Sequence, residues 1–123
     1  MRIIKPEWLR HDSDKKHLTS IFSVDFHPDG TRLATAGMDN KIRLWSTPAI
    51  AEQNPQENKD RRLLATLSAH SGAVMCVRFS HGAGRYLASG ADDMVVLIWE
   101  RDDSDAGTGN IGASEPSHES WRP

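Results

Sequence analysis

The sequence predicts an all-β fold of the propeller class, with about two four-stranded antiparallel blades. The first observation is an internal repeat, because residues 22–45 (FSVDFHPDGTRLATAGMDNKIRLW) align with residues 75–99 (MCVRFSHGAGRYLASGADDMVVLIW). The copies end in Trp45 and Trp99, which are 54 positions apart. That spacing exceeds the roughly 40–45 residues of a four-stranded propeller repeat by about ten. The polar insert 47–62 accounts for the excess.

The second observation is the alternation of apolar and polar residues that half-buried strands require. Phe22, Val24 and Phe26 alternate with polar residues, and "HPDG" then supplies Pro, Asp and Gly where a turn needs them. No helical period appears along the chain. The predicted strands are 22–26, 32–36, 41–45 and 62–67 in the first blade, and 74–79, 85–90 and 95–99 in the second. The last of these, "VVLIW", is apolar on both faces, which predicts cover on both sides.

The chain divides into four parts. Residues 1–20 hold an N-terminal strand and a charged connector, and the stretch "RIIKPEWL" within them is expected to be the outer strand of the last blade of an intact ring, without that partner here. Residues 21–67 form the first repeat with its insert 47–62, and residues 68–100 form the second. Residues 101–123 form a polar loop and the start of the next outer strand. The connector 11–17, the insert 47–62 and the loop 101–120 are predicted to be unstructured from their composition.

Composition narrows the class of protein. The 123 residues carry a net charge of −2, so no basic excess attracts the chain to nucleic acid. The N-terminus has no signal-peptide core, and no apolar run approaches the roughly 20 residues of a membrane helix. The single cysteine excludes an internal disulfide. We therefore expect an intracellular chain without direct nucleic-acid binding or membrane insertion.

A hydroxyl, a carboxylate and an indole recur in fixed register, and in the second copy they are Ser89, Asp93 and Trp99. A buried indole N–H needs an acceptor, which Ser89 supplies while donating onward. His70, just before the copy, is able to accept from Ser89 with one ring nitrogen and donate to Asp93 with the other. We therefore predict a structural hydrogen-bond network of these four residues, which requires every member to be present.

The first copy carries the same register in Thr35, Asp39 and Trp45. Two histidines compete for the fourth place. Spacing to the following strand favours His17, whereas the "WLRH" context favours His11. We take His11 as the predicted member.

Ser89, His70 and Asp93 are also the residue types of a nucleophilic triad. Ser89 lies within a strand in "YLASGA", away from the exposed turn that a nucleophile needs, and Trp99 competes for its lone pairs. We therefore expect no catalytic residues and no enzyme activity.

The surrounding sequence also argues against a cofactor site and a metal site. "GTGNIG" (residues 107–112) matches a dinucleotide-binding pattern in letters, but no strand precedes it and no helix follows it. No C-x-x-C or H-x-x-x-H spacing supports a zinc site, and Cys76 is expected to pack within its strand. The sequence predicts neither a cofactor nor a metal.

These residues carry a resemblance to a known family. The two copies look like WD repeats of a β-propeller. The opening "KPEWLRH" and the closing "GASEPSHESWRP" further resemble the N-terminus of the HIRA/HIR histone chaperone, the WD-repeat subunit of the histone-regulator complex. The similarity runs end to end and is strongest over 21–45 and 62–100. One departure is that Ser46 and Glu100 stand where many WD repeats have Asp after Trp.

The resemblance implies a nuclear binding scaffold that acts in replication-independent nucleosome assembly and represses histone-gene transcription. Its implied partners are the other subunits of the histone-regulator complex and core histones. Two alternatives are the middle WD-repeat subunit of chromatin assembly factor one, which is replication-coupled, and a generic WD-repeat adaptor.

Length sets a further expectation. A seven-bladed ring needs roughly 300 residues at about 40–45 per blade. Two blades leave sheet faces uncovered, including apolar residues such as Val96 and Ile98. We therefore expect a fragment that is poorly soluble or self-associating and that binds partners weakly if at all.

Overall fold

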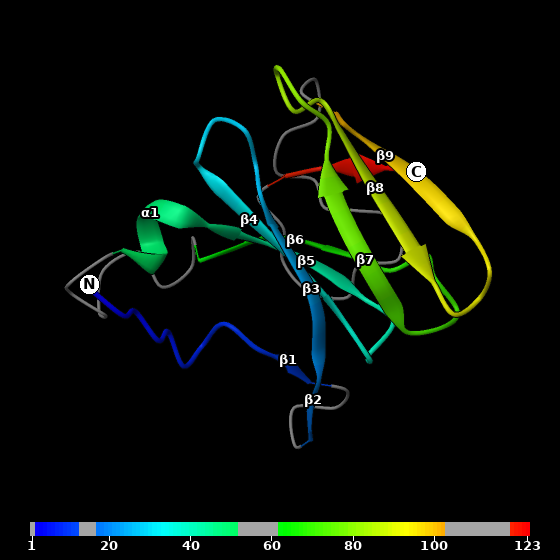
Figure 1. Cartoon of the computed structure of the whole chain (residues 1–123), viewed down its shortest axis with the longest axis horizontal. Coiled ribbons are helices and arrows are strands. Elements are labelled where there is room, and N and C mark those ends of the chain that lie inside the picture. The colour runs from blue at the N-terminus through cyan, green and yellow to red at the C-terminus, as the bar shows by residue number, and fades with distance from the viewer. Residues whose placement is uncertain (1, 13–16, 52–61, 103–118) are drawn as a thin grey trace.

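The computed structural model describes residues 2–12, 17–51, 62–102 and 119–123 of the chain, and these form two four-stranded antiparallel sheets (Figure 1). The first sheet has the order β3-β4-β5-β6, and the second has the order β10-β9-β8-β7. The strands of the first sheet are β3 (Ile21–Phe26), β4 (Arg32–Gly37), β5 (Ile42–Ser46) and β6 (Leu63–Leu67). Those of the second are β7 (Val74–Phe79), β8 (Tyr86–Ala91), β9 (Val96–Arg101) and β10 (Trp121–Arg122).

The fold class predicted from the sequence is confirmed, because each repeat forms a meander of three consecutive strands with a fourth, outer strand. In the first sheet that outer strand is β6, which follows the insert. In the second it is the two-residue β10, which follows residues 102–120 in sequence and pairs with the end of β9. The closing "ESW" segment therefore completes the second blade.

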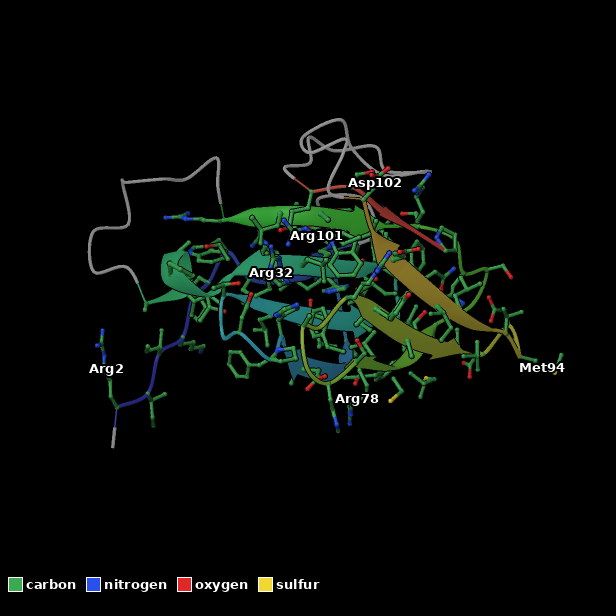
Figure 2. The ribbon with its side chains drawn as sticks, turned by 90° about the horizontal axis from the view of Figure 1, so that it is seen from above. Arg2, Arg32, Arg78, Met94, Arg101 and Asp102 are labelled. Atoms are coloured by element: carbon green, nitrogen blue, oxygen red, sulfur yellow. The ribbon has the colours of Figure 1, made fainter. Side chains whose placement is uncertain are left out.

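The register of the second sheet decides which side chains are buried. Phe79, Leu87 and Trp99 are direct cross-strand partners on one face, and all three are buried. That face packs against the first sheet, where β3 lies beside β7 (Figures 1 and 2). The shared core between the sheets contains Ala34, Ala36, Ile42, Leu44, Ala65, Leu67, Val74, Val77, Phe79, Leu87, Trp99 and Trp121.

The opposite face of the second sheet is exposed. Val96 is 70% and Ile98 is 53% accessible to solvent, as expected for a blade without a neighbour on that side. Cys76 is also exposed, so the prediction that it packs within its strand is wrong. The reason is that its neighbours across the sheet, Gly90 and Val96, belong to this uncovered face.

Three short segments differ from the sequence prediction. The stretch "RIIKPEWL", expected as an outer strand, contains none. With no neighbouring strand to complete a ladder, it instead turns where the Leu9 N–H donates to the Pro6 carbonyl at 3.2 Å. The connector predicted as unstructured begins with β1 (His11–Asp12), which pairs with β2 (Leu18–Thr19).

The third difference lies in the insert 47–62, which begins with a single helical turn, α1 (Thr47–Ile50). The hydroxyl of Ser46 accepts the Ala49 N–H at 3.3 Å, and Pro48 lies in the first turn, where its missing N–H costs nothing. A single turn is too short to produce a detectable helical period. The "GTGNIG" stretch at 107–112 lies outside the described residues.

Candidate functional site

The second hydrogen-bond network is assembled around the His70 ring. The indole N–H of Trp99 donates to Ser89 Oγ at 2.9 Å, and the Ser89 hydroxyl donates to His70 Nε2 at 2.7 Å. His70 Nδ1–H then donates to Asp93 Oδ2 at 3.0 Å. These four residues come from β8, β9, the turn between them and the loop before β7. The structure therefore brings together all four residues that the sequence selected.

The first network has the same wiring. Trp45 Nε1–H donates to Thr35 Oγ1 at 2.8 Å, the Thr35 hydroxyl donates to His11 Nε2 at 2.7 Å, and His11 Nδ1–H donates to Asp39 Oδ1 at 2.9 Å. His11 is fully buried, and it occupies the place for which His17 had been the other candidate. The N-terminal segment therefore positions His11 in the first network, as the loop before β7 positions His70 in the second.

Asp39 is ionised within this network. Burial by itself raises the pKa of Asp39. The hydrogen bond from His11, the Lys41 N–H and the positive charge of Arg43 outweigh burial and hold that pKa below its usual 3.8. The Lys41 N–H donates to Asp39 Oδ1 at 3.2 Å, and Arg43 Nη2 lies 3.5 Å from Oδ2. The Asp39 carboxylate therefore holds both the His11 ring and the β4–β5 turn, to which Asp39 itself belongs.

The pKa of Asp93 is also lowered, but the largest cause is different. Its largest stabilising contact is the Ser71 N–H, which donates to Oδ2 at 2.9 Å. The hydrogen bond from His70 and the Val95 N–H at 3.1 Å also lower its pKa, against the opposing effect of burial. Asp93 therefore ties the loop before β7 to the β8–β9 turn.

The Ser89–His70–Asp93 distances match those of a nucleophilic triad, so accessibility decides between the two interpretations. Ser89 is 2% exposed, and the Trp99 indole occupies one of its lone pairs. A nucleophile must reach the substrate carbonyl, which this hydroxyl does not do. The geometry favours a structural network over a catalytic one.

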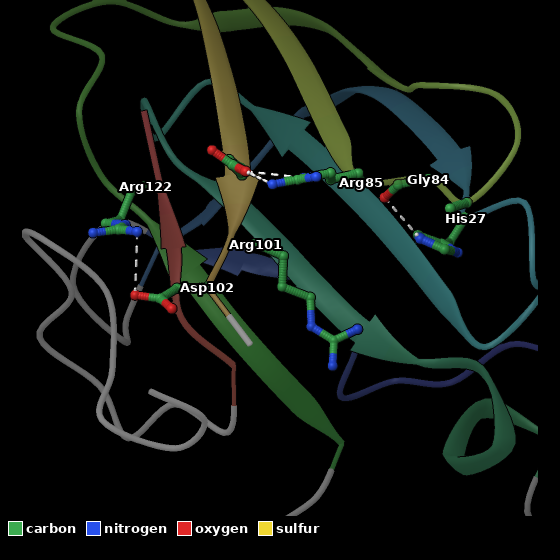
Figure 3. Close-up of a pocket in the computed structure, with 8 residues that line it drawn as sticks. His27, Gly84, Arg85, Arg101, Asp102 and Arg122 are labelled. Atoms are coloured by element: carbon green, nitrogen blue, oxygen red, sulfur yellow. Dashed lines mark hydrogen bonds and ion pairs between the residues drawn. The ribbon is translucent and has the colours of Figure 1, made fainter. Parts of the chain in front are cut away.

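A separate cavity of about 480 Å³ lies where the two blades meet (Figure 3). Its surface carries three arginines with acidic neighbours. Arg85 pairs with Glu100 at 2.6 Å, and Arg122 pairs with Asp102 at 3.4 Å. Because its cations already face acids, the cavity has no strong preference for an anion. It is lined by His27, Ala83, Gly84, Arg85, Glu100, Arg101, Asp102 and Arg122, so Ser89 does not open into it.

The turns of the two blades meet at one edge of this cavity. His27, from the β3–β4 turn, donates its Nε2–H to the Gly84 carbonyl at 2.9 Å, and its ring packs edge-on against Phe79 with centroids 5.0 Å apart. Gly84 has φ +65°, and an added Cβ would overlap the His27 ring. Only glycine fits this close approach.

A buried ion pair makes a second connection between the blades. Arg32 Nε donates to Glu119 Oε2 at 2.6 Å, and the Glu119 N–H donates to the Leu64 carbonyl at 2.9 Å. The adjoining Trp121 is fully buried, with its ring 6.1 Å from that of Phe79. The segment that completes the second blade is thus anchored on the first.

The N-terminal segment packs on the far side of the first blade. The rings of Trp8 and Trp45 are 5.6 Å apart, and the Arg62 guanidinium lies 4.9 Å from the centre of the Trp8 ring. The "KPEW" stretch thus covers the indole of the first network. It acts as a packing element and not as a strand.

Sequence reasoning missed the contacts between the blades. His27 lies in the "HPDG" turn and Glu119 in the closing "ESW", and both stretches had been singled out for other reasons. Nothing in the sequence around His27 or Glu119 indicates that its partner lies 57 or 87 positions away. In the described part of the chain, no cluster of three metal-ligating side chains occurs. No helix there is long and apolar enough to cross a membrane.

Comparisons with known proteins agree with this geometry. Residues 11–46 and 61–100 match the profile of the family described as WD domain, G-beta repeat. The fold is similar to that of a solved structure, Saccharomyces cerevisiae Sqt1. Its TM-score is 0.55 at 25% identity, over 69% of this chain and 20% of that one.

The sequence is similar to several HIR1 and HIRA proteins. It is 52% identical to Protein HIR1 of Mycosarcoma maydis over 100% of this chain and 12% of that protein. It is 48% identical to Protein hir1 of Schizosaccharomyces pombe over 99% and 13%, and 46% identical to Protein HIRA of Oryza sativa subsp. japonica over 96% and 12%. The chain thus spans about an eighth of the length of these relatives. The resemblance to the HIRA/HIR proteins is confirmed, and the chain belongs to the WD-repeat family.

Proposed function

We propose that the chain is part of the WD-repeat scaffold of a histone chaperone complex in the nucleus. The observation that carries this proposal is the 52% identity to a HIR1 protein along the whole chain. The proposed activities are replication-independent nucleosome assembly and repression of histone-gene transcription. The proposed partners are the other subunits of the histone-regulator complex and core histones.

The structure supports a scaffold by its rigidity. Two buried networks hold the turns of each blade, and the His27–Gly84 and Arg32–Glu119 contacts hold one blade against the other. Such joints keep surface side chains in fixed relative positions, which lowers the entropy lost when a partner binds. The buried Ser89 supports a binding role over an enzymatic one.

Direct DNA binding is not part of the proposal. The chain has 15 basic and 17 acidic residues, and the three arginines at the cavity face acidic groups. Binding through phosphates requires a basic surface that releases counterions. Contact with DNA would therefore be made by the histones or by other subunits.

A capture experiment tests the proposal. The tagged 123-residue chain is incubated separately with purified subunits of the histone-regulator complex, with histones H3–H4, and with purified subunits of chromatin assembly factor one. We expect retention of the histone-regulator subunits above the level seen with an unrelated WD-repeat protein. Retention of the chromatin assembly factor subunits alone would favour the replication-coupled alternative. Retention equal to that of the unrelated protein would contradict both.

A further inference from the structure

His27 lies in the turn between β3 and β4, and its side chain reaches across to the second blade (Figure 3). Its backbone N–H donates to the Arg32 carbonyl at 2.9 Å, and its own carbonyl accepts the Gly30 N–H at 2.9 Å. The side chain is only 5% exposed and packs edge-on against Phe79. The turn on one side and the second blade on the other therefore hold the ring in place.

Both ring nitrogens of His27 face an acceptor. Nε2 lies 2.9 Å from the Gly84 carbonyl oxygen, and Nδ1 lies 2.8 Å from Asp29 Oδ1. A neutral imidazole has one N–H and one lone pair, so either tautomer places a lone pair against one of these two oxygens. The imidazolium ion has two N–H groups and donates to both. The protonated ring is therefore the state that satisfies both contacts at these distances.

The neutral ring has a different arrangement available. The backbone N–H of Asp29 donates to His27 Nδ1 at 3.2 Å, so an unprotonated Nδ1 has a donor once the Asp29 carboxylate turns away. That side chain is 49% exposed and has room to turn. It also has other donors, because Oδ1 accepts both the N–H and the hydroxyl of Thr31, at 2.8 and 2.6 Å. His27 and Asp29 thus have two arrangements, which differ by one proton.

Asp29 is the charge that the His27 ring contacts directly. The hydrogen bonds from Thr31 lower the pKa of Asp29 from 3.8 to about 2, against the opposing effect of burial. Asp29 is therefore ionised throughout the range of about pH 5 to 8 in which histidines change charge. The other charged side chains around the ring and across the cavity lie in acid–base groups: Arg32 and Arg101 with Glu119, Arg85 with Glu100, and Arg122 with Asp102. Because these charges largely cancel, the Asp29 carboxylate dominates the field at the ring.

We propose that His27 is a proton-sensitive joint between the two blades, in which the protonated ring bridges the Asp29 carboxylate and the Gly84 carbonyl. A charged donor forms a hydrogen bond roughly twice as strong as a neutral one, so the proton strengthens the contact with Gly84 and adds the contact with Asp29. The added contribution to stability is present in mild acid and is lost as the pH rises through the range in which histidine titrates. The two blades are therefore held together more firmly in mild acid than in mild base.

The corresponding turn of the second blade lacks this chemistry. Ser80 takes the place of His27, because its N–H donates to the Tyr86 carbonyl at 2.8 Å as the His27 N–H does to Arg32. The Ser80 hydroxyl then accepts the Tyr86 N–H at 3.1 Å, so this turn closes without a titrating side chain. His81 lies beside Ser80 and is exposed, which makes it a matched control.

A double-mutant cycle between His27→Gln and Asp29→Asn tests the joint. Urea unfolding of the whole chain and its three variants gives the coupling of the two side chains, and effects of the buried His11 and His70 cancel because all four proteins contain them. At a pH of about 5.5 the coupling should favour the folded chain by about two- to fivefold in the unfolding equilibrium constant, and at about 8.5 it should vanish. The cycle between His81→Gln and Asp29→Asn should show no coupling at either pH. A His27–Asp29 coupling that is equal at both pH values would overturn the proposal.

Nuclear magnetic resonance of the wild-type chain tests the same joint without a substitution at His27. At a pH of about 5.5 both ring nitrogens should have the chemical shifts of protonated nitrogens, and as the pH rises Nδ1 should lose its proton while Nε2 keeps its own. The Gly84 carbonyl carbon shift should change over the same pH range, because its donor changes from a charged to a neutral N–H. An unprotonated Nδ1 at the lower pH, or a constant Gly84 shift while the ring titrates, would overturn the proposal. Neither measurement involves a partner, so its outcome is independent of the capture experiment.

Discussion

Arg32 and Glu119 are 87 positions apart in sequence and form a buried ion pair, with Nε 2.6 Å from Oε2. Arg32 begins β4 of the first blade, and Glu119 lies just before β10 of the second (Figure 2 labels Arg32). The pair fastens the strand that closes the second blade to the body of the first. The two repeats therefore depend on each other for stability.

Glu119→Gln should destabilise the chain strongly. It removes one partner of a buried pair and leaves the Arg32 charge uncompensated, which costs about 3–5 kcal/mol in comparable pairs. The neighbouring Asp29 places the expected loss at the lower end of that range. Glu100→Gln breaks the exposed Arg85 pair and is the matched control, with an expected loss of about 0–1 kcal/mol. Urea unfolding of both variants measures the difference, and equal losses would show that the buried pair does not join the blades.

Gly84→Ala should cost more than Gly82→Ala. Both glycines have positive φ, at +65° and +73°, so each alanine variant pays about 1–2 kcal/mol for the left-handed backbone. At Gly82 an added Cβ has open space, whereas at Gly84 it would overlap the His27 ring. Overpacking adds about 1–3 kcal/mol at Gly84. Thermal unfolding compares the two variants, and indistinguishable midpoints would mean that the His27 contact is dispensable.

Met94→Asn should stabilise the chain. Met94 is 95% exposed and has φ 64°, a conformation that is unfavourable for a side chain without a local hydrogen-bonding group. The other repeat has Asn40 with φ 69° at the equivalent place. We expect a gain of about 0.5–1 kcal/mol in the free energy of unfolding. Met38→Asn, at an exposed position without positive φ, should bring no gain, and a similar gain there would contradict the backbone explanation.

The pH dependence of stability should report on Asp39. Because its pKa is lowered from 3.8 in the folded chain, the unfolded chain binds more protons in acid. The contribution of Asp39 is therefore fully present above a pH of about 3.8 and is lost as pH falls through the lower folded pKa. Asp39→Asn should lower stability at neutral pH, and its difference from wild type should shrink in acid. The exposed Asp92→Asn controls for the loss of one negative charge. A difference for Asp39→Asn that stays constant down to a pH of about 2 would contradict this account.

The parts of the fold that depend on local sequence patterns could be predicted from the sequence. Alternation located the strands, and the recurring spacing of hydroxyl, carboxylate and indole identified both networks. Spacing alone favoured His17, but the network contains His11, because the choice depends on where the N-terminal segment crosses the first blade. Contacts between blades, such as Asp25 with the Phe79 N–H, depend on how two sheets pack and leave no periodic trace.

The central claim is that the recurring register serves structure and not catalysis, and Ser89→Ala tests it most directly. The substitution removes the acceptor for the Trp99 N–H and the donor to His70, and leaves buried groups unpaired. Urea unfolding should show a loss of about 1–3 kcal/mol. Hydrolysis of p-nitrophenyl acetate, followed on the same samples, should equal the buffer rate for both wild type and variant. Unchanged stability, together with esterase activity that the wild type has and Ser89→Ala lacks, would contradict the account.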